Sequence, residues 1–279
     1  KLVSAHGCAC DPVAECMMNR SAFFLTGGTE TPASLCQKLT DAGMGEAHGV
    51  VGENLGTEAE AIRYGSAAEL AGQSFAPLSV LLVENFDLPQ LRAPGFPDES
   101  FIRSEVPMTK QEVRAAALAK LAVMPTDTLW DVGAGTGSVS VELALAAPKG
   151  RVYAVECEPD ACELIRKNRA KFHACNLILI EGRAPDVLAD LPAPDAVFIG
   201  GTKGGMEAVL DEVLGKNPNA RICISAIALE TLGAAIAALT ARGLTAEVTQ
   251  IAVSRTKPAG RLHLLMANNP IFLITGTRK

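Results

Sequence analysis

A glycine-rich turn at residues 129–137, Leu-Trp-Asp-Val-Gly-Ala-Gly-Thr-Gly, constrains the fold of this chain more than any other segment. The apolar residues before it are typical of a short buried strand, and residues 138–147 after it have the composition of a helix that ends before Pro148. Glycines at a strand-to-helix crossing let a ligand approach the backbone and the exposed N–H groups of the helix start. The segment therefore predicts a site for a nucleotide-like cofactor, with a purely structural turn as the alternative.

The spacing of the glycines narrows the class of cofactor. A dinucleotide fingerprint has the pattern G-x-G-x-x-G, whereas Gly133, Gly135 and Gly137 follow G-x-G-x-G. Glu156 ends the next strand-like run, where a carboxylate can accept both hydroxyls of a ribose. Together these motifs resemble those of class I S-adenosylmethionine-dependent methyltransferases. The resemblance implies that the strand-end acid and the turn hold the amino-acid half of the cofactor, and that Glu156 holds its sugar, so the expected contacts are Asp131, Gly133, Ala134, Gly135, Thr136, Gly137 and Glu156.

Strand-like and helix-like runs alternate beyond this turn, which predicts an α/β domain with a mostly parallel sheet. Ligands of such sheets bind outside the carboxyl ends of the strands. Two further strand-like runs, 245–253 and 262–267, are expected to close the sheet as a hairpin. The whole pattern matches the Rossmann-like seven-stranded sheet of class I methyltransferases.

The first part of the chain, residues 1–87, reads as a smaller α/β unit. Residues 25–28, 51–56 and 75–85 resemble the C-terminal half of a tetrapyrrole (corrin/porphyrin) methylase domain of the precorrin C5-methylating type. In that family the cofactor lies between two subdomains, and the N-terminal one would precede residue 1, so this unit is not expected to complete a methylation site. A docking or oligomerisation module is the alternative. Proline-rich residues 88–99 predict an extended linker to a second domain, 100–279.

A helix is expected to open within residues 106–114, with Thr109 as its cap and Glu112 closing a capping box. The run Thr-Lys-x-Glu-Val-Arg resembles the first helix of the precorrin-6Y C15-methylating, decarboxylating family. That family's threonine touches the cofactor, which the resemblance carries over to Thr109, with capping alone as the alternative. The run Glu-Gly-Arg-Ala-Pro from residue 181 resembles the family's loop along the adenine, which implies contacts from Gly182 and Ala184; a plain surface turn is the alternative.

Residues 195–205 predict the floor of a substrate site. They lack the Asn/Asp-Pro-Pro-aromatic motif of enzymes that methylate exocyclic amines, and their glycines leave room for a bulky planar substrate, as in the precorrin enzymes. A flexible connector is the alternative. Precorrins carry many carboxylates, which arginine and lysine can pair. The expected substrate-binding residues are Gly200, Gly201, Lys203, Arg114 and Arg255, although most basic side chains only solvate a surface.

Composition excludes several classes of protein. The 279-residue chain has a net charge of −6, so it lacks the basic field of nucleic-acid-binding proteins, and its apolar runs are too short to span a bilayer. Among its eight cysteines, the group Cys8, Cys10 and Cys16 lacks the paired spacing of a metal site, so no metal is expected. Reduced thiols in the cytoplasm are the simpler interpretation.

The resemblance covers nearly the whole chain. It implies S-adenosylmethionine-dependent methylation of a precorrin at C15, coupled to loss of carbon dioxide from the ring C acetate in cobalamin biosynthesis, by a homo-oligomer such as a tetramer. No Cys–His or Ser–His–Asp arrangement is recognisable, so no residue is assigned as acid or base. Two alternatives remain open: a class I methyltransferase acting on RNA or protein, and a non-catalytic cofactor-binding scaffold.

Overall fold

The computed structural model describes residues 1–89 and 93–278, which form two compact units. The first unit contains residues 1–89 together with 170–176, and the second contains the remaining described residues. Each is described by itself below.

The first unit is built on a five-stranded sheet with strand order β1-β2-β5-β3-β4. β1 pairs parallel to β2, and the other neighbours are antiparallel. Its strands are β1 (Leu2–Ser4), β2 (Ser21–Leu25), β3 (His48–Glu53), β4 (Ala61–Ser66) and β5 (Ser79–Glu84). Three helices accompany them: α1 (Pro12–Met18), α2 (Pro32–Asp41) and α3 (Ala67–Ala71).

Helix α2 begins with a side-chain cap followed by a proline. The Thr31 hydroxyl accepts a hydrogen bond from the Ser34 N–H, and Pro32 occupies the first turn, where no N–H donor is needed. Leu35 and Leu39 then face the core of the unit together with Phe24 of β2. Local capping and apolar spacing therefore agree with the tertiary packing.

The second unit contains a seven-stranded sheet with the order β11-β14-β10-β9-β6-β7-β8. Five neighbouring strands, in the order β10-β9-β6-β7-β8, are parallel to one another. Strand β14 runs antiparallel to both of its neighbours, β10 and β11. The strands are β6 (Thr128–Val132), β7 (Arg151–Glu156), β8 (Leu177–Glu181), β9 (Ala196–Ile199), β10 (Arg221–Ala226), β11 (Thr245–Ile251) and β14 (Ile271–Thr277). The helices are α4 (Gln111–Leu121), α5 (Ser138–Ala146), α6 (Pro159–Lys171), α7 (Met206–Lys216) and α8 (Leu229–Ala241).

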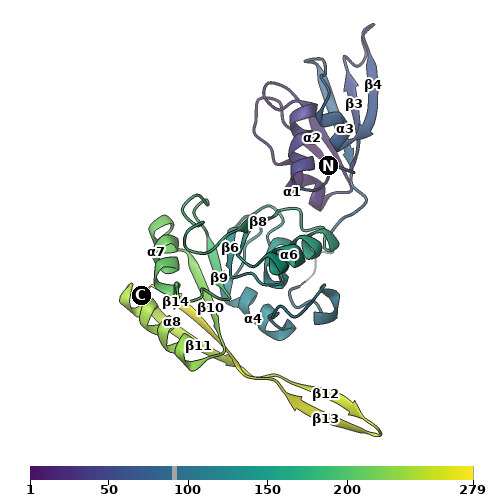
Figure 1. Cartoon of the computed structure of the whole chain (residues 1–279). Helices are drawn as coiled ribbons and strands as arrows, with labels where there is room; N and C mark the ends of the chain where they lie inside the picture. Colours follow the sequence, from purple (N-terminus) through teal and green to yellow (C-terminus); the bar gives the residue numbers. More distant parts are fainter. Residues whose placement is uncertain (90–92, 279) are drawn as a thin grey trace. The chain divides into compact units, whose positions relative to one another are not determined.

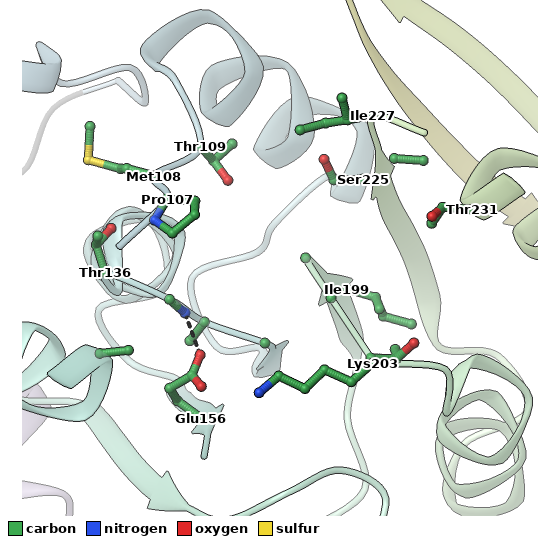
Figure 2. Close-up of a pocket in the computed structure, with 18 of the residues that line it drawn as sticks. Pro107, Met108, Thr109, Thr136, Glu156, Ile199, Lys203, Ser225, Ile227 and Thr231 are labelled. Atoms are coloured by element: carbon green, nitrogen blue, oxygen red, sulfur yellow. Dashed lines mark hydrogen bonds between the residues drawn. The ribbon is translucent and has the colours of Figure 1, made fainter. Parts of the chain in front are cut away.

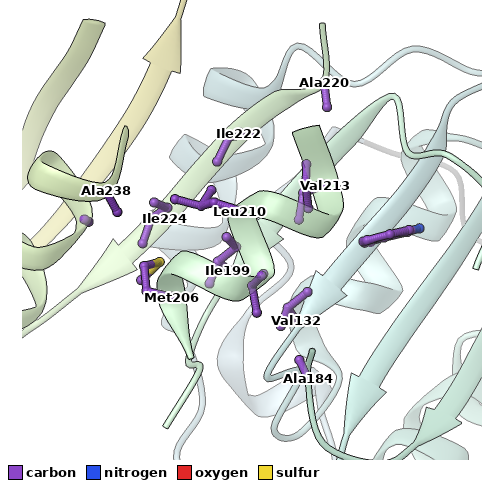
Figure 3. Packing of buried hydrophobic residues seen from close by; sticks show 14 of the residues in the cluster. Val132, Ala184, Ile199, Met206, Leu210, Val213, Ala220, Ile222, Ile224 and Ala238 are labelled. Atoms are coloured by element: carbon purple, nitrogen blue, oxygen red, sulfur yellow. The ribbon is translucent and has the colours of Figure 1, made fainter. Parts of the chain in front are cut away.

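The alternation of side chains along β6 assigns helices to the two faces of this sheet. Trp130 and Val132 share a buried apolar cluster with Leu210 of α7 and Leu239 of α8 (Figure 3). Asp131 points the opposite way, because successive strand residues face opposite sides, and it accepts a hydrogen bond from Ser140 of α5. Helices therefore cover both faces, which leaves the carboxyl ends of the parallel strands as the place for a ligand.

Two strands depart from the sequence-based expectation. The expected partner of β11 was residues 262–267, but β11 pairs with β14 instead. Residues 262–267 form β13 (Leu262–Ala267), which pairs only with β12 (Ser254–Ala259) in a separate two-stranded ribbon that projects from the sheet (Figure 1). The residues of β13 and those of β14 both have the composition of a strand, so the sequence pattern alone does not decide which of the two pairs with β11.

The segment before α4 also differs from expectation. Phe96 and Asp98, predicted to lie in an extended linker, are buried in the second unit, and Asp98–Ser100 form a short 3₁₀ helix. The capping-box prediction is wrong: α4 begins after Lys110 without a side-chain cap of its own, and the Gln111 N–H donates to the distant Asp98 carboxylate.

Within residues 1–89 and 93–278, no helix combines the length and apolarity that crossing a membrane requires.

Candidate active site

A cavity of about 920 Å³ opens at the carboxyl ends of the parallel strands of the second unit. The loops after β6, β7, β8, β9 and β10 line it, together with the segment before α4 (Figure 2). At one end the lining is the glycine turn and its neighbours, namely Val106–Lys110, Gly133–Thr136, Val155–Glu158 and Gly182–Ala184. We call this part the cofactor end and the rest the far end.

Two glycines of the turn, Gly135 and Gly137, perform different tasks. Gly135 lines the cavity with φ +56°, and a Cβ built there would lie 3.2 Å from the carbonyl oxygen of Pro107. Gly137 is not on the cavity wall. A Cβ on Gly137 would lie 2.9 Å from Cγ1 of Ile165 in α6, so its missing side chain makes room for a packed helix. The predicted ligand contact from Gly137 is therefore not supported by its position.

Glu156 lies on the cavity wall at the end of β7, with its carboxylate directed at the turn (Figure 2). Its Oε2 accepts the Gly135 N–H at 2.8 Å, and its Oε1 accepts the N–H groups of Cys157 and Glu158 at 2.7 and 3.0 Å. A carboxylate has about four acceptor sites. The three backbone donors fix the orientation of Glu156 and leave it able to accept from a ligand hydroxyl.

Other predicted cofactor residues also reach this end. Thr109, Ala134, Thr136, Gly182 and Ala184 all line the cavity. Thr109 does so from the segment opposite the glycine turn (Figure 2). Residues separated by more than 70 positions in the sequence are thus brought to one end of one cavity.

Asp131 lies behind the turn rather than on the cavity wall. It is 1% exposed, its Oδ2 accepts from the Ser140 hydroxyl at 2.5 Å, and its Oδ1 has no hydrogen-bond partner. Burial raises the pKa of Asp131 to about 7, and the nearby Glu156 charge adds to the rise while the Ser140 hydrogen bond opposes it. The predicted direct contact between Asp131 and a cofactor is not supported by this position.

The far end of the cavity is mostly apolar. Its apolar lining consists of Ile199 of β9, Ile227 after β10, Ile251 at the end of β11 and Ile271 at the start of β14. Polar groups come from Ser225, Thr231, Asn268 and Asn269. Sequence reasoning missed this wall, because its residues come from four separated segments with no shared motif. Their position after strand ends was the only available signal.

Gly200, Gly201 and Lys203 line the cavity as expected for a substrate floor. No atom lies within 4 Å of a Cβ built on Gly201, so the space above it is open. The Lys203 side chain reaches across the cavity toward Glu156 (Figure 2) and forms an ion pair with Glu158. The hydrogen bond that Lys203 donates to Glu158 within this ion pair raises the pKa of the Lys203 ammonium. Lys203 therefore carries a positive charge at the cavity mouth.

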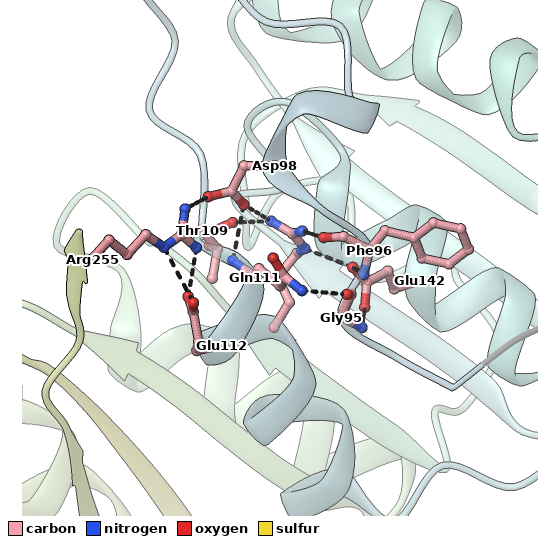
Figure 4. Close-up of polar contacts among 9 residues, drawn as sticks. Gly95, Phe96, Asp98, Thr109, Gln111, Glu112, Glu142 and Arg255 are labelled. Atoms are coloured by element: carbon pink, nitrogen blue, oxygen red, sulfur yellow. Dashed lines mark hydrogen bonds and ion pairs between the residues drawn. The ribbon is translucent and has the colours of Figure 1, made fainter. Parts of the chain in front are cut away.

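The prediction that Arg114 contacts substrate is wrong. Its side chain is fully buried and donates to Asp98, Glu142 and the carbonyl oxygens of Phe96 and Thr109 (Figure 4). Its cationic group also lies 4.6 Å from the centre of the Phe101 ring. Arg114 is therefore enclosed by the protein, and it is not one of the residues that line the cavity.

Arg255, the other predicted substrate arginine, does not line the cavity either. It pairs with Asp98 at 3.0 Å and with Glu112 at 2.7 Å, from the base of the β12–β13 ribbon (Figure 4). Both predictions depend on the charge of the arginines and on their position in the sequence near the expected site. Charge does not reveal whether a side chain already has an internal partner.

The fold and the cavity define a class I methyltransferase: a seven-stranded sheet with β14 antiparallel, and a glycine turn facing an acid at the end of the next strand. The sequence profile described as precorrin methyltransferase domain matches residues 100–278. The chain belongs to this precorrin methyltransferase family.

Individual relatives agree with this assignment. A Pyrobaculum calidifontis protein named probable cobalt-precorrin-6B C(15)-methyltransferase (decarboxylating) is 46% identical over 187 residues, which cover 65% of this chain and 95% of that protein. The crystal structure of a precorrin-6Y C5,15-methyltransferase from Geobacter metallireducens matches 69% of this chain and all of that chain, with 38% identity and a TM-score of 0.65. The C-terminal domain of the Rhodobacter capsulatus precorrin-6Y C5,15-methyltransferase matches 67% of this chain and 98% of that chain, with 37% identity and a TM-score of 0.59.

Proposed function

We propose that the second unit transfers a methyl group from S-adenosylmethionine to C15 of a precorrin and promotes loss of carbon dioxide from the ring C acetate, in cobalamin biosynthesis. The observation that carries this proposal is the single cavity that joins the glycine turn and Glu156 to a large apolar chamber. The relatives that match nearly their whole length to this unit carry the name of this reaction.

The residues at the cofactor end fit the proposed cofactor. Gly135 leaves space where a side chain would approach Pro107, and Glu156 is held by backbone donors in a position to accept hydroxyl groups of a ribose. Ala184 and Gly182 offer a narrow apolar surface for the adenine, and Thr109 offers a hydroxyl. Asp131 would act from behind the turn, through its hold on α5, rather than by contact.

The far end fits a large, planar, carboxylate-bearing substrate. Apolar walls at Ile199 and Ile227 exclude water from the ring face, Gly200 and Gly201 form an open floor, and Lys203 can exchange Glu158 for a carboxylate of the substrate. The bound cofactor supplies an activated methyl group. Holding the macrocycle carbon in line with it accounts for much of the rate, and no protein base is assigned.

The test is to mix the protein with S-adenosylmethionine and a precorrin or cobalt-precorrin that retains its ring C acetate. The expected product has gained one methyl group and lost carbon dioxide, seen by mass spectrometry and by a change in the visible spectrum. Methylation of RNA or protein with no reaction of the tetrapyrrole would favour the first alternative. Absence of heat on titration with S-adenosylhomocysteine would favour a non-catalytic scaffold.

We also propose that the first unit is the C-terminal subdomain of a tetrapyrrole methylase. The matched domain is the C-terminal one of the Rhodobacter capsulatus protein, and in this chain the second unit likewise follows the first, which supports this order. Since this subdomain alone is not expected to complete a site, calorimetry should give one S-adenosylhomocysteine bound per chain. Two sites per chain would contradict the assignment.

A homo-oligomer, such as a tetramer, is the assembly we propose. The β12–β13 ribbon exposes Leu262, Leu264, Leu265 and Met266, and contiguous exposed apolar side chains mark interaction surfaces. Leu265→Asp should shift the mass measured by light scattering toward the monomer. A monomeric wild-type protein would contradict this proposal without affecting the reaction.

A further inference from the structure

Residues 102–110, which we call the strap, cross the cofactor end of the cavity between the 3₁₀ helix and α4. Its last five residues, Val106–Lys110, line the cavity. The Pro107 carbonyl oxygen is the nearest atom to a Cβ built on Gly135, at 3.2 Å. The position of the strap therefore sets how much room remains above the glycine turn.

Side chains outside the cavity hold both ends of the strap. At the first end, the buried Asn168 of α6 bonds the N–H and the carbonyl of Ile102 at 2.8 and 3.0 Å, and it also bonds the Thr136 carbonyl. At the other end, Arg114 donates to the Thr109 carbonyl. The strap itself has no helix or strand, so these contacts are what fix it.

Asp98 links Arg114, which holds the second end of the strap, to the β12–β13 ribbon. Its Oδ1 accepts from the Gln111 N–H and from Arg114 Nη1, both at 2.9 Å, and its Oδ2 accepts from Arg255 Nη1 at 3.0 Å (Figure 4). Asp98 is 2% exposed, so water cannot replace a lost partner. A displacement of Arg255 must therefore be passed to Arg114 and to the start of α4.

We propose that Asp98 is a positioning residue for the cofactor site, and that through Arg255 it makes the position of the strap depend on the β12–β13 ribbon. The inference rests on the proposed function and deepens it, because it names a control of the same site. Asp98 touches neither cavity nor ligand. It acts through Arg114, which holds Thr109, and through Gln111, which begins α4.

The test uses Asp98→Asn in the full chain. The amide keeps one oxygen for Gln111 and Arg114, but it replaces the oxygen that accepts from Arg255 with a donor. We expect S-adenosylhomocysteine to bind about tenfold weaker by calorimetry, a typical size for coupling through a packed polar network. Arg255→Gln, at a half-exposed side chain that can be changed without unfolding the unit, should reproduce the loss. The double variant should be no worse than either single one, because both changes cut the same link.

Glu247→Gln is the matched control. Lys120 and Glu247 form another ion pair between α4 and the sheet, near the opposite end of the helix from the strap. This variant should bind S-adenosylhomocysteine with wild-type affinity. If Asp98→Asn and Arg255→Gln also bind with wild-type affinity, the inference is overturned while the proposed function stands. If the wild-type protein itself binds none, the cofactor assignment fails and the inference with it.

Discussion

The two ends of the cavity are built by different means. Buried polar groups support the cofactor end: Asn168, Arg114 and Glu156 each fix backbone segments through charged or amide side chains. Apolar side chains such as Ile199 and Ile227 form the far end. Directional bonds hold a small, fixed ligand shape, whereas an apolar chamber tolerates a bulky ring and selects by size. Substitutions should therefore separate cofactor binding from substrate binding.

The largest effect is expected at Arg114. Arg114→Ala leaves the carboxylates of Asp98 and Glu142 buried without their shared guanidinium, which should lower the free energy of unfolding of the second unit by about 3–5 kcal/mol. Chemical denaturation measures this change. Lys167→Ala, which removes an exposed helical ion pair with Glu163, should leave stability nearly unchanged. Equal effects of the two variants would show that the buried ion pairs of Arg114 do not stabilise the second unit.

Gly135→Val should remove cofactor binding. A branched residue at φ +56° is strained, and its side chain would enter the cavity beside Pro107. We expect S-adenosylhomocysteine affinity to fall at least about 100-fold, equal to about 2.7 kcal/mol. Gly233→Ala is the control, because a Cβ there meets nothing within 4 Å. Unchanged binding by Gly135→Val would remove the turn from the cofactor site.

Asp131, which lies behind the glycine turn, is expected to make the free energy of unfolding depend on pH. Its folded pKa of about 7 lies above the ordinary value of 3.8, so between these two pH values the folded state holds a proton that the unfolded state has lost. This contribution to stability is fully present below pH 3.8 and is lost as the pH rises to about 7. Between pH 5.5 and 8 the wild-type protein should lose about 2 kcal/mol that Asp131→Asn does not lose, at about 1.4 kcal/mol per pKa unit.

Denaturation curves of both proteins at the two pH values measure this difference, with other titrating groups cancelling in the comparison. Parallel pH dependence of the two proteins would contradict a raised pKa for Asp131.

The smallest effect is expected at the far end. Ile227→Asp places a negative charge where a carboxylate-bearing ring would lie, so the KM for the tetrapyrrole should rise about tenfold. S-adenosylhomocysteine affinity should stay at the wild-type level. Leu229→Asp, at a 70% exposed residue outside the cavity wall, should change neither. A weaker cofactor affinity in Ile227→Asp would mean that the two ends are not separate sites.

Local sequence patterns predicted the parts of the site that depend on the backbone. The glycine turn, the acid at the end of β7 and the loop after β8 are each specified by a few adjacent residues, and all three lie on the cavity. Thr109 also reaches the cavity, although it does not cap α4 as its sequence suggested.

The arginines show where such patterns fail. The carboxylate partners of Arg114 lie 16 and 28 residues away, and the Asp98 partner of Arg255 lies 157 residues away. Nothing near either arginine in the chain distinguishes a buried anchor from a ligand contact. Likewise β13 and β14 have similar composition, but only β14 enters the sheet.

The sequence by itself determined the α/β class, the glycine turn and the acid that faces it, because strand, turn and helix signals act over a few neighbouring residues. Only the tertiary structure decided which charges are internal, which strand closes the sheet, and which four segments form the far wall. Those outcomes depend on burial and on partners distant in the chain, and the free energy of a charged or apolar side chain is set by the surroundings that folding gives it.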